Sequence, residues 1–231
     1  MTIRWYSGVL NRNIAPGICE FTQCDAPDLS LAHPQAPHWL ANHFLSSMLR
    51  GQLQGTHRQY ALNLLFRAQA CFNRYHSARE LTLKYLSSGD VQNPAIRTYF
   101  LALAEWESCF LNAQIFVDIL NKMGASGSAP IFVDNDGSPE QRAYGIANSV
   151  KHWGSDLAHG RHLDEHTVPL WLSDAGFETR ANKLTFKELG ELIEGIALLA
   201  NDVQDPASLA KHKAEAEVGR PSDETGNGDT A

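Results

Sequence analysis

Two long segments in the middle of the chain constrain the fold most. Residues 57–87 place Tyr60, Leu64, Ala68, Cys71, Tyr75 and Ala78 at steps of four and three, as an amphipathic helix requires. Residues 95–123 are apolar on nearly every side, which is typical of a helix in the middle of a bundle. The pair Ser88-Gly89 ends the first segment. The sequence therefore predicts a bundle built around two long helices.

The flanking segments add shorter elements. Apolar side chains at near-helical spacing predict a short helix over residues 39–50. Ser138-Pro139-Glu140 is an N-cap hydroxyl followed by proline at the first helical position, so a helix should start there and end near His159 and Gly160. Residues 124–137 read as a flexible connector.

The last part of the bundle carries a turn signal and a capping box. Asp174-Ala175-Gly176 lies between short apolar runs and predicts a small hairpin. Thr185 and Glu188 form a capping box ahead of the last strong helix. We therefore predict an all-α protein, a four- to five-helix bundle with a small β-hairpin inserted before the last core helix. Its parts are a loop-rich N-terminal arm (1–38), a helical-bundle domain (39–204) and a charged, largely disordered tail (205–231).

Composition limits the partners. The formal net charge is −7 and the pI is about 5.8, which argues against a protein that binds polyanions over its whole surface. No window approaches a membrane-spanning length of apolar residues, and the first residues lack a continuous hydrophobic signal segment. The four cysteines indicate reduced thiols rather than a disulfide framework. We expect a soluble, cytoplasmic protein with no membrane partner.

The stretch VKHWGSDLAHGRHLDEH, residues 150–166, holds four of the ten histidines. At about 100° per residue, Ile146, Val150, Trp153 and Leu157 share one face, which should be the core face. Asn148, His152, Ser155, Asp156 and His159 fall on the other side. This side is either an ordinary solvated surface or a face that a ligand or second subunit covers.

The segment RAYGIANSVKH, residues 142–152, resembles the HEPN superfamily of helical bundles, with Asn148, Lys151 and His152 set inside a late helix. The resemblance implies a homodimer that meets across this helix and, in active members, cuts RNA without a metal. The family's usual motif has four to six residues between Arg and His. Here nine residues separate Arg142 from His152, about 80° apart around the helix. Arg161 and His166 fit the shorter spacing, with His162 between them, but lie at or past the expected helix end.

If the site is active, His152 is the candidate base that takes a 2′-hydroxyl proton. The candidate cations for the crowded phosphate are Lys151, Arg142 and Arg161. His159, Arg161 and His166 are candidate binding residues. RNA binding by an acidic chain would need a positive groove from Arg67, Arg74 and Arg79. Alternatively, arginines of the first long helix pair inside the bundle with Glu105 and Asn112 of the second.

Two metal hypotheses stay open. Cys19, Cys24, His33 and His38 have the spacing C-x4-C-x8-H-x4-H in a proline-rich region, which suits zinc but lacks the tight C-x2-C step. His159, His162 and His166 with Asp164 or Glu165 form a second set. The paired Glu-x-x-His motifs of di-iron bundles, a phosphate-binding glycine loop and a nucleophile elbow are missing. We therefore expect no cofactor.

Three functions follow. The first is a HEPN-like homodimer that binds RNA or cleaves it without a metal ion. The second is a non-enzymatic module that binds another protein, and the third is a zinc-stabilised regulatory protein.

Overall fold

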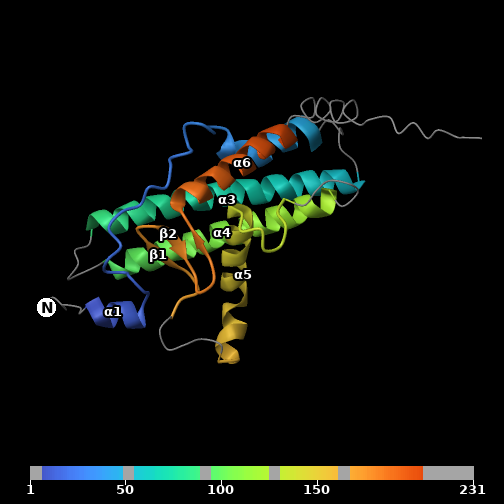
Figure 1. Cartoon of the computed structure of the whole chain (residues 1–231). Helices are drawn as coiled ribbons and strands as arrows, with labels where there is room; N and C mark the ends of the chain where they lie inside the picture. Colours follow the sequence, from blue (N-terminus) through green and yellow to red (C-terminus); the bar gives the residue numbers. More distant parts are fainter. Residues whose placement is uncertain (1–6, 49–54, 89–94, 125–130, 161–166, 205–231) are drawn as a thin grey trace, which may run out of the picture.

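Two antiparallel helices, α3 (Gly55–Ser88) and α4 (Ile96–Gly124), run side by side through the middle of the protein (Figure 1). The computed structural model describes residues 7–48, 55–88, 95–124, 131–160 and 167–204. Both helices lie within two residues of their predicted bounds. α3 packs through its predicted face, with Leu64, Ala68, Cys71 and Tyr75 fully buried. α4 buries Tyr99 and Trp106 but leaves Phe100 and Leu101 exposed, so it is not covered on every side. The predicted all-α bundle with a small β insertion is confirmed.

Two further helices complete the bundle. α6 (Phe186–Gln204) packs along α3, whereas α5 (Pro139–Ala158) packs across α4 and extends beyond it (Figure 1). Both begin as predicted. The Ser138 side chain accepts from the Gln141 backbone N–H at 3.2 Å, with Pro139 at the first helical position. Thr185 and Glu188 exchange the two hydrogen bonds of a capping box, at 2.9 and 3.1 Å.

The predicted hairpin is present and gains a third strand. β1 (Trp171–Ser173), β2 (Gly176–Glu178) and β3 (Lys183–Leu184) form an antiparallel sheet in that order, with Leu172 opposite Phe177 and Phe177 opposite Leu184. The Phe177 ring lies 4.7 Å from the rings of Trp106 and Phe186, measured between centroids. The sheet therefore closes one end of the core with aromatic side chains.

The N-terminal arm is held against the bundle. It contains α1 (Ser7–Asn13) and the 3₁₀ turn η1 (Ala36–His38), and the chain then continues into α2 (Trp39–His43) and the π-helical turn η2 (Phe44–Met48). The loop prediction was wrong for α1, which buries only Leu10 and so leaves no periodic apolar signal. The predicted helix over 39–50 is confirmed as far as Met48, and residues 49 and 50 lie outside the described part.

Side chains of α3 satisfy the backbone of the extended part of this arm. Tyr75, Arg79 and Tyr85 donate to the carbonyl groups of Pro27, Ala26 and Ile18, at 2.9, 2.9 and 2.8 Å. Such partners are required where a segment forms no ladder of its own. Arm and bundle share one core, while the predicted domain division and the disordered tail stay predictions, because the tail lies outside the described residues.

Candidate functional site

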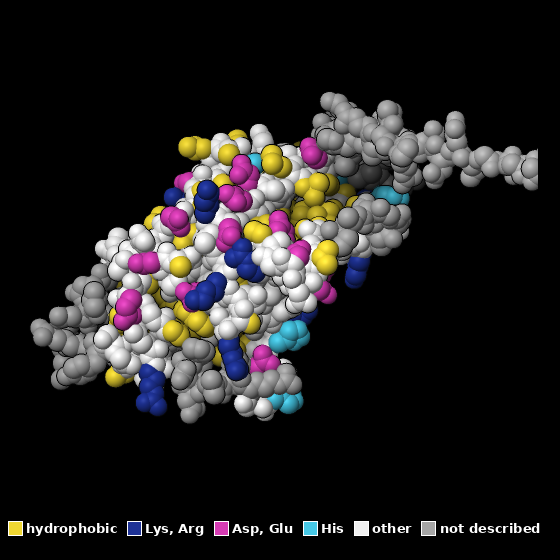
Figure 2. All heavy atoms as spheres, viewed as in Figure 1, with side chains coloured by type: hydrophobic (Ala, Val, Ile, Leu, Met, Phe, Trp, Pro, Cys, Tyr) yellow, Lys and Arg dark blue, Asp and Glu magenta, His cyan; other side chains and the backbone are white. Residues whose placement is uncertain are grey.

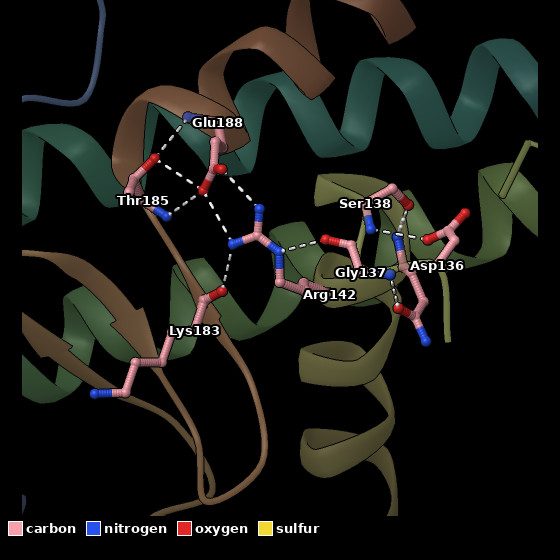
Figure 3. Close-up of polar contacts among 8 residues, drawn as sticks. Asp136, Gly137, Ser138, Arg142, Lys183, Thr185 and Glu188 are labelled. Atoms are coloured by element: carbon pink, nitrogen blue, oxygen red, sulfur yellow. Dashed lines mark hydrogen bonds and ion pairs between the residues drawn. The ribbon is translucent and has the colours of Figure 1, made fainter. Parts of the chain in front are cut away.

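The first half of α5 is fastened to α6 by Arg142 (Figure 3). The Arg142 guanidinium donates to both carboxylate oxygens of Glu188, at 2.7 and 3.3 Å, and to the backbone carbonyls of Lys183 and Gly137, at 2.8 and 3.2 Å. The same carboxylate caps α6 through Thr185. The hydrogen bonds from Arg142 are the main cause that lowers the pKa of Glu188.

This network occupies the guanidinium of Arg142. His152 lies ten residues further along the helix, about 15 Å away at 1.5 Å per residue. Arg142 and His152 therefore lie apart within one protomer. Their separation of about 80° around the helix predicts this.

Asn148 lies on the contact between α5 and α4. Its side-chain oxygen accepts a hydrogen bond of 2.6 Å from Nε2 of Gln114, a residue that is buried in α4. One turn earlier, the Tyr144 hydroxyl donates to Asp118 at 3.0 Å, and burial raises the pKa of Tyr144. The prediction that Asn148 lies on the side away from the core was wrong. Because α5 crosses α4, the contacting face includes polar residues that the apolar pattern does not mark.

The second half of α5 leaves the bundle. Lys151 and His152 are exposed, so the prediction that His152 points away from the core is confirmed. Trp153 is partly buried, but Leu157 is 52% exposed. The predicted core face therefore ends before Leu157, because α5 extends past the helices against which it packs (Figure 1).

His152, Ser155 and His159 form one exposed stripe on this projecting half. Steps of three and four residues place them on the same helix face, and Asn148 continues the stripe one turn toward the bundle. His152 therefore lies one turn beyond the point where α5 contacts α4. Nδ1 of His159 is 2.6 Å from the Ser155 carbonyl oxygen, which can only accept, so we infer that Nδ1 donates to it. The stripe thus presents two imidazoles to solvent, with Lys151 beside them.

The remaining histidine-rich residues are not described. α5 ends at Ala158, with His159 as the C-cap and Gly160 in the left-handed region at φ +61°, close to the predicted end. Candidate residues Arg161, His162, Asp164, Glu165 and His166 lie outside the described residues. Their part in binding RNA or a metal stays a prediction.

The arm's zinc set is not assembled. Within the described residues, no group of three or more His, Cys, Asp or Glu is placed to hold a metal ion. Cys19 and His33 are buried and His38 is exposed, so the four predicted ligands do not converge. Burial raises the pKa of both Cys19 and Cys24. The buried ring of His33 instead packs edge-on against Phe72, with centroids 5.9 Å apart.

Three arginines of α3 have partners in the protein, and the pairing alternative is confirmed for two of them, Arg67 and Arg74. Arg67 donates to Asn112 at 3.0 Å and Arg74 pairs with Glu105 at 2.9 Å. Arg79 donates to the Ala26 carbonyl and lies 3.4 Å from Asp28. In Figure 2 the Lys and Arg side chains lie scattered among Asp and Glu on the face shown. These three arginines do not supply the positive groove that tight RNA binding would require.

A pocket that no motif predicted lies between α4, α5 and α6. Its volume is about 220 Å³, and its walls are mostly apolar, including Phe116, Leu120, Leu192 and Leu199. In Figure 2 hydrophobic side chains line a hollow beside the C-terminal half of α6. The helical pattern of α6 contains two glycines, Gly190 and Gly195, and only Gly195 lines the pocket.

Comparison of the chain with models of known protein families, with curated proteins and with solved structures finds no match. Of the helices that the structure describes, none offers a stretch both long and apolar enough to cross a bilayer.

Proposed function

We propose that this chain is a HEPN-like protein that acts as a homodimer and cleaves RNA without a metal ion, using the projecting half of α5. One observation carries the proposal: two histidines, His152 and His159, lie on one exposed stripe with Lys151 beside it. The likeness of residues 142–152 to the HEPN motif gives the reaction class. Two imidazole groups commonly serve as the general acid and the general base near neutral pH.

The projecting half of α5 also suggests the dimer. Leu157 is 52% exposed and Trp153 partly exposed, on a helical segment that extends past its own bundle. A second copy packed over this segment would cover the leucine and bring two stripes near each other. Arg142 takes no part in this pairing, because its guanidinium is engaged with Glu188 in each protomer.

The reaction needs only groups of the stripe and the RNA. His152 removes the proton from a 2′-hydroxyl, whose oxygen attacks the adjacent phosphorus while the bond to the 5′-oxygen breaks. The leaving oxygen takes a proton from the imidazolium of His159, whose Nε2 is directed away from the Ser155 carbonyl. The products are a 2′,3′-cyclic phosphate and a 5′-hydroxyl. Lys151 stabilises the negative charge that gathers on the phosphate oxygens.

RNA binding should be weak and should depend little on salt. Arg67, Arg74 and Arg79 have internal partners, and the net charge is −7. Each neutralised phosphate contributes a slope of about −0.7 to the plot of log K against log salt for single strands. We expect a slope of about −1 to −2 rather than the steep slope of a protein with a broad basic groove.

The test combines light scattering with RNA cleavage in the presence of EDTA. We expect a dimer that dissociates in His152→Glu, and cleavage that falls by about 100-fold or more in His152→Ala. His57→Ala removes an exposed histidine from α3 and serves as the matched control. Cyclic phosphate ends that appear equally with wild type and His152→Ala would contradict the proposal, because the activity would then come from elsewhere.

A non-enzymatic protein-interaction module is the second candidate. The observation that favours it is the exposed Leu157 on a helix that carries few free cations. A wild-type monomer with no RNA cleavage would favour this candidate. A binding partner lost on Leu157→Asp and retained on His57→Ala would then identify the interaction surface.

A further inference from the structure

The pocket between α4, α5 and α6 is large enough for a small organic molecule. Its volume is about 220 Å³. An apolar cavity of about 150 Å³ in another protein accepts benzene. The walls contributed by Phe116, Leu120 and Ile196 match an apolar body of one ring or a short alkyl chain.

Gly195 is exposed, and it forms the open, solvent-facing side of the pocket on α6. It lines the pocket in the interior of α6, and a Cβ atom built there would meet nothing within 4 Å. Glycine is the poorest helix former after proline, and here no close neighbour excludes a side chain. Gly190 lies five residues earlier in α6, and a Cβ atom built there would lie 2.4 Å from Pro27. Close packing explains the glycine at 190 but not the one at 195.

The charge around the pocket selects the head group of a ligand. Glu140 of α5 and Glu191 of α6 contribute to its lining, and none of its lining residues is Lys or Arg. Glu191 also lies 3.8 Å from Lys187, and both of these side chains are mostly exposed. Two carboxylates at a mostly apolar pocket favour a cationic head group and disfavour an anionic one.

We propose that this pocket binds a small hydrophobic amine, with the apolar body between α4 and α6 and the ammonium group near Glu140 and Glu191. The site is separate from the histidine stripe, which lies on the projecting half of α5. The inference therefore stands whether or not the chain cleaves RNA.

Isothermal titration with matched amines and acids tests the proposal. The probes are 2-phenylethylamine and hexylamine, each compared with the carboxylate of similar size, 3-phenylpropionate and hexanoate. We expect saturable binding of at least one amine at one site per chain, at least 10-fold tighter than its matched acid. Absence of saturable binding by both amines would overturn the proposal, and so would an acid that binds as tightly as its amine.

Variants locate the binding. Gly195→Phe should abolish amine binding by filling the pocket mouth, whereas Gly195→Ala, the matched control, should retain it within about 3-fold. Ala113→Phe fills the pocket from the α4 wall and should also abolish binding. The double change Glu140→Gln and Glu191→Gln should weaken the amine by about 10-fold and leave the acid unchanged or tighter. Amine binding that survives both phenylalanine variants would place the ligand elsewhere and overturn the proposal.

Discussion

The two halves of α5 belong to one unbroken helix but have opposite relations to the rest of the molecule. In the first half Arg142 is fastened to Glu188, Ile146 is fully buried and Asn148 accepts from Gln114. In the second half Lys151, His152, Ser155 and His159 face solvent. One continuous helix is therefore packed against the bundle in its first half and exposed in its second half. The groups left available for chemistry are those that the fold does not use.

The difference follows from where α5 crosses the bundle. Its stripe of polar residues begins at Asn148, which faces α4, and continues through His152 and His159, which have passed the edge of α4. The rigid anchoring of the first half positions the second half without covering it. Rigid support beneath an exposed group is what a binding or catalytic surface requires.

The largest effect should come from truncating one apolar side chain in each half. Ile146→Ala removes a fully buried side chain and should lower the free energy of unfolding by about 2–4 kcal/mol. Leu157→Ala removes a side chain that is 52% exposed and should change it by less than about 0.5 kcal/mol at low protein concentration. Urea unfolding of both variants measures the contrast.

An equal loss of unfolding free energy in Ile146→Ala and Leu157→Ala would contradict the contrast between the two halves, because Leu157 would then be covered in solution. Repeating the unfolding at rising protein concentration separates the causes. A stabilisation of the wild type with concentration that is absent in Leu157→Ala would place a second copy on this surface.

The second effect concerns the cations of the two halves. Arg142→Met removes four hydrogen bonds and leaves the partly buried Glu188 and two carbonyl groups without that partner, so we expect a loss of about 1–2 kcal/mol at pH 7. Lys151→Met, the matched control on the exposed half, should change stability by less than about 0.5 kcal/mol. Urea unfolding of the two variants checks the pair.

The pH dependence identifies the cause of that loss. The Arg142 hydrogen bonds hold the pKa of Glu188 below its ordinary value of 4.5 in the folded protein. A lowered pKa contributes stability that is present above the unfolded pKa and is lost as the pH falls through the folded pKa. The advantage of wild type over Arg142→Met should therefore be constant above about pH 5.5 and shrink toward pH 3. An advantage that stays constant down to pH 3 would show that the Arg142–Glu188 pair is not its source.

The sequence predicts the parts whose signals are local. The long helices α3 and α4, the N-cap at Ser138 and the capping box at Thr185 each rest on spacing or capping chemistry that packing does not alter. The Arg74–Glu105 pair could also be anticipated, because a carboxylate on a largely apolar helix requires a partner.

The parts that were not predicted depend on how elements cross. The apolar stripe of α5 extends to Leu157, but the bundle that it should contact ends earlier. Asn148 was placed on the side away from the core because it lies opposite the apolar face of the helical wheel, which gives no sign of the α4 contact. The pocket is formed by three helices that are distant in sequence, and no motif in the sequence marks it. The short helix α1 was not predicted, because its single buried leucine cannot produce a helical periodicity of apolar residues.

The smallest effect compares a glycine from each half of the same helix. Gly154 lies in the projecting half, and a Cβ atom there would meet nothing within 4 Å. Gly154→Ala should stabilise the protein by about 0.5–1 kcal/mol through helix propensity alone. At Gly145, in the anchored half, the same atom would lie 2.6 Å from Nδ2 of Asn182. Because that side chain must shift, Gly145→Ala should yield less than Gly154→Ala or destabilise. Thermal unfolding of both variants measures the difference, and an equal gain at the two positions would mean that the anchored half is as loosely packed as the projecting one.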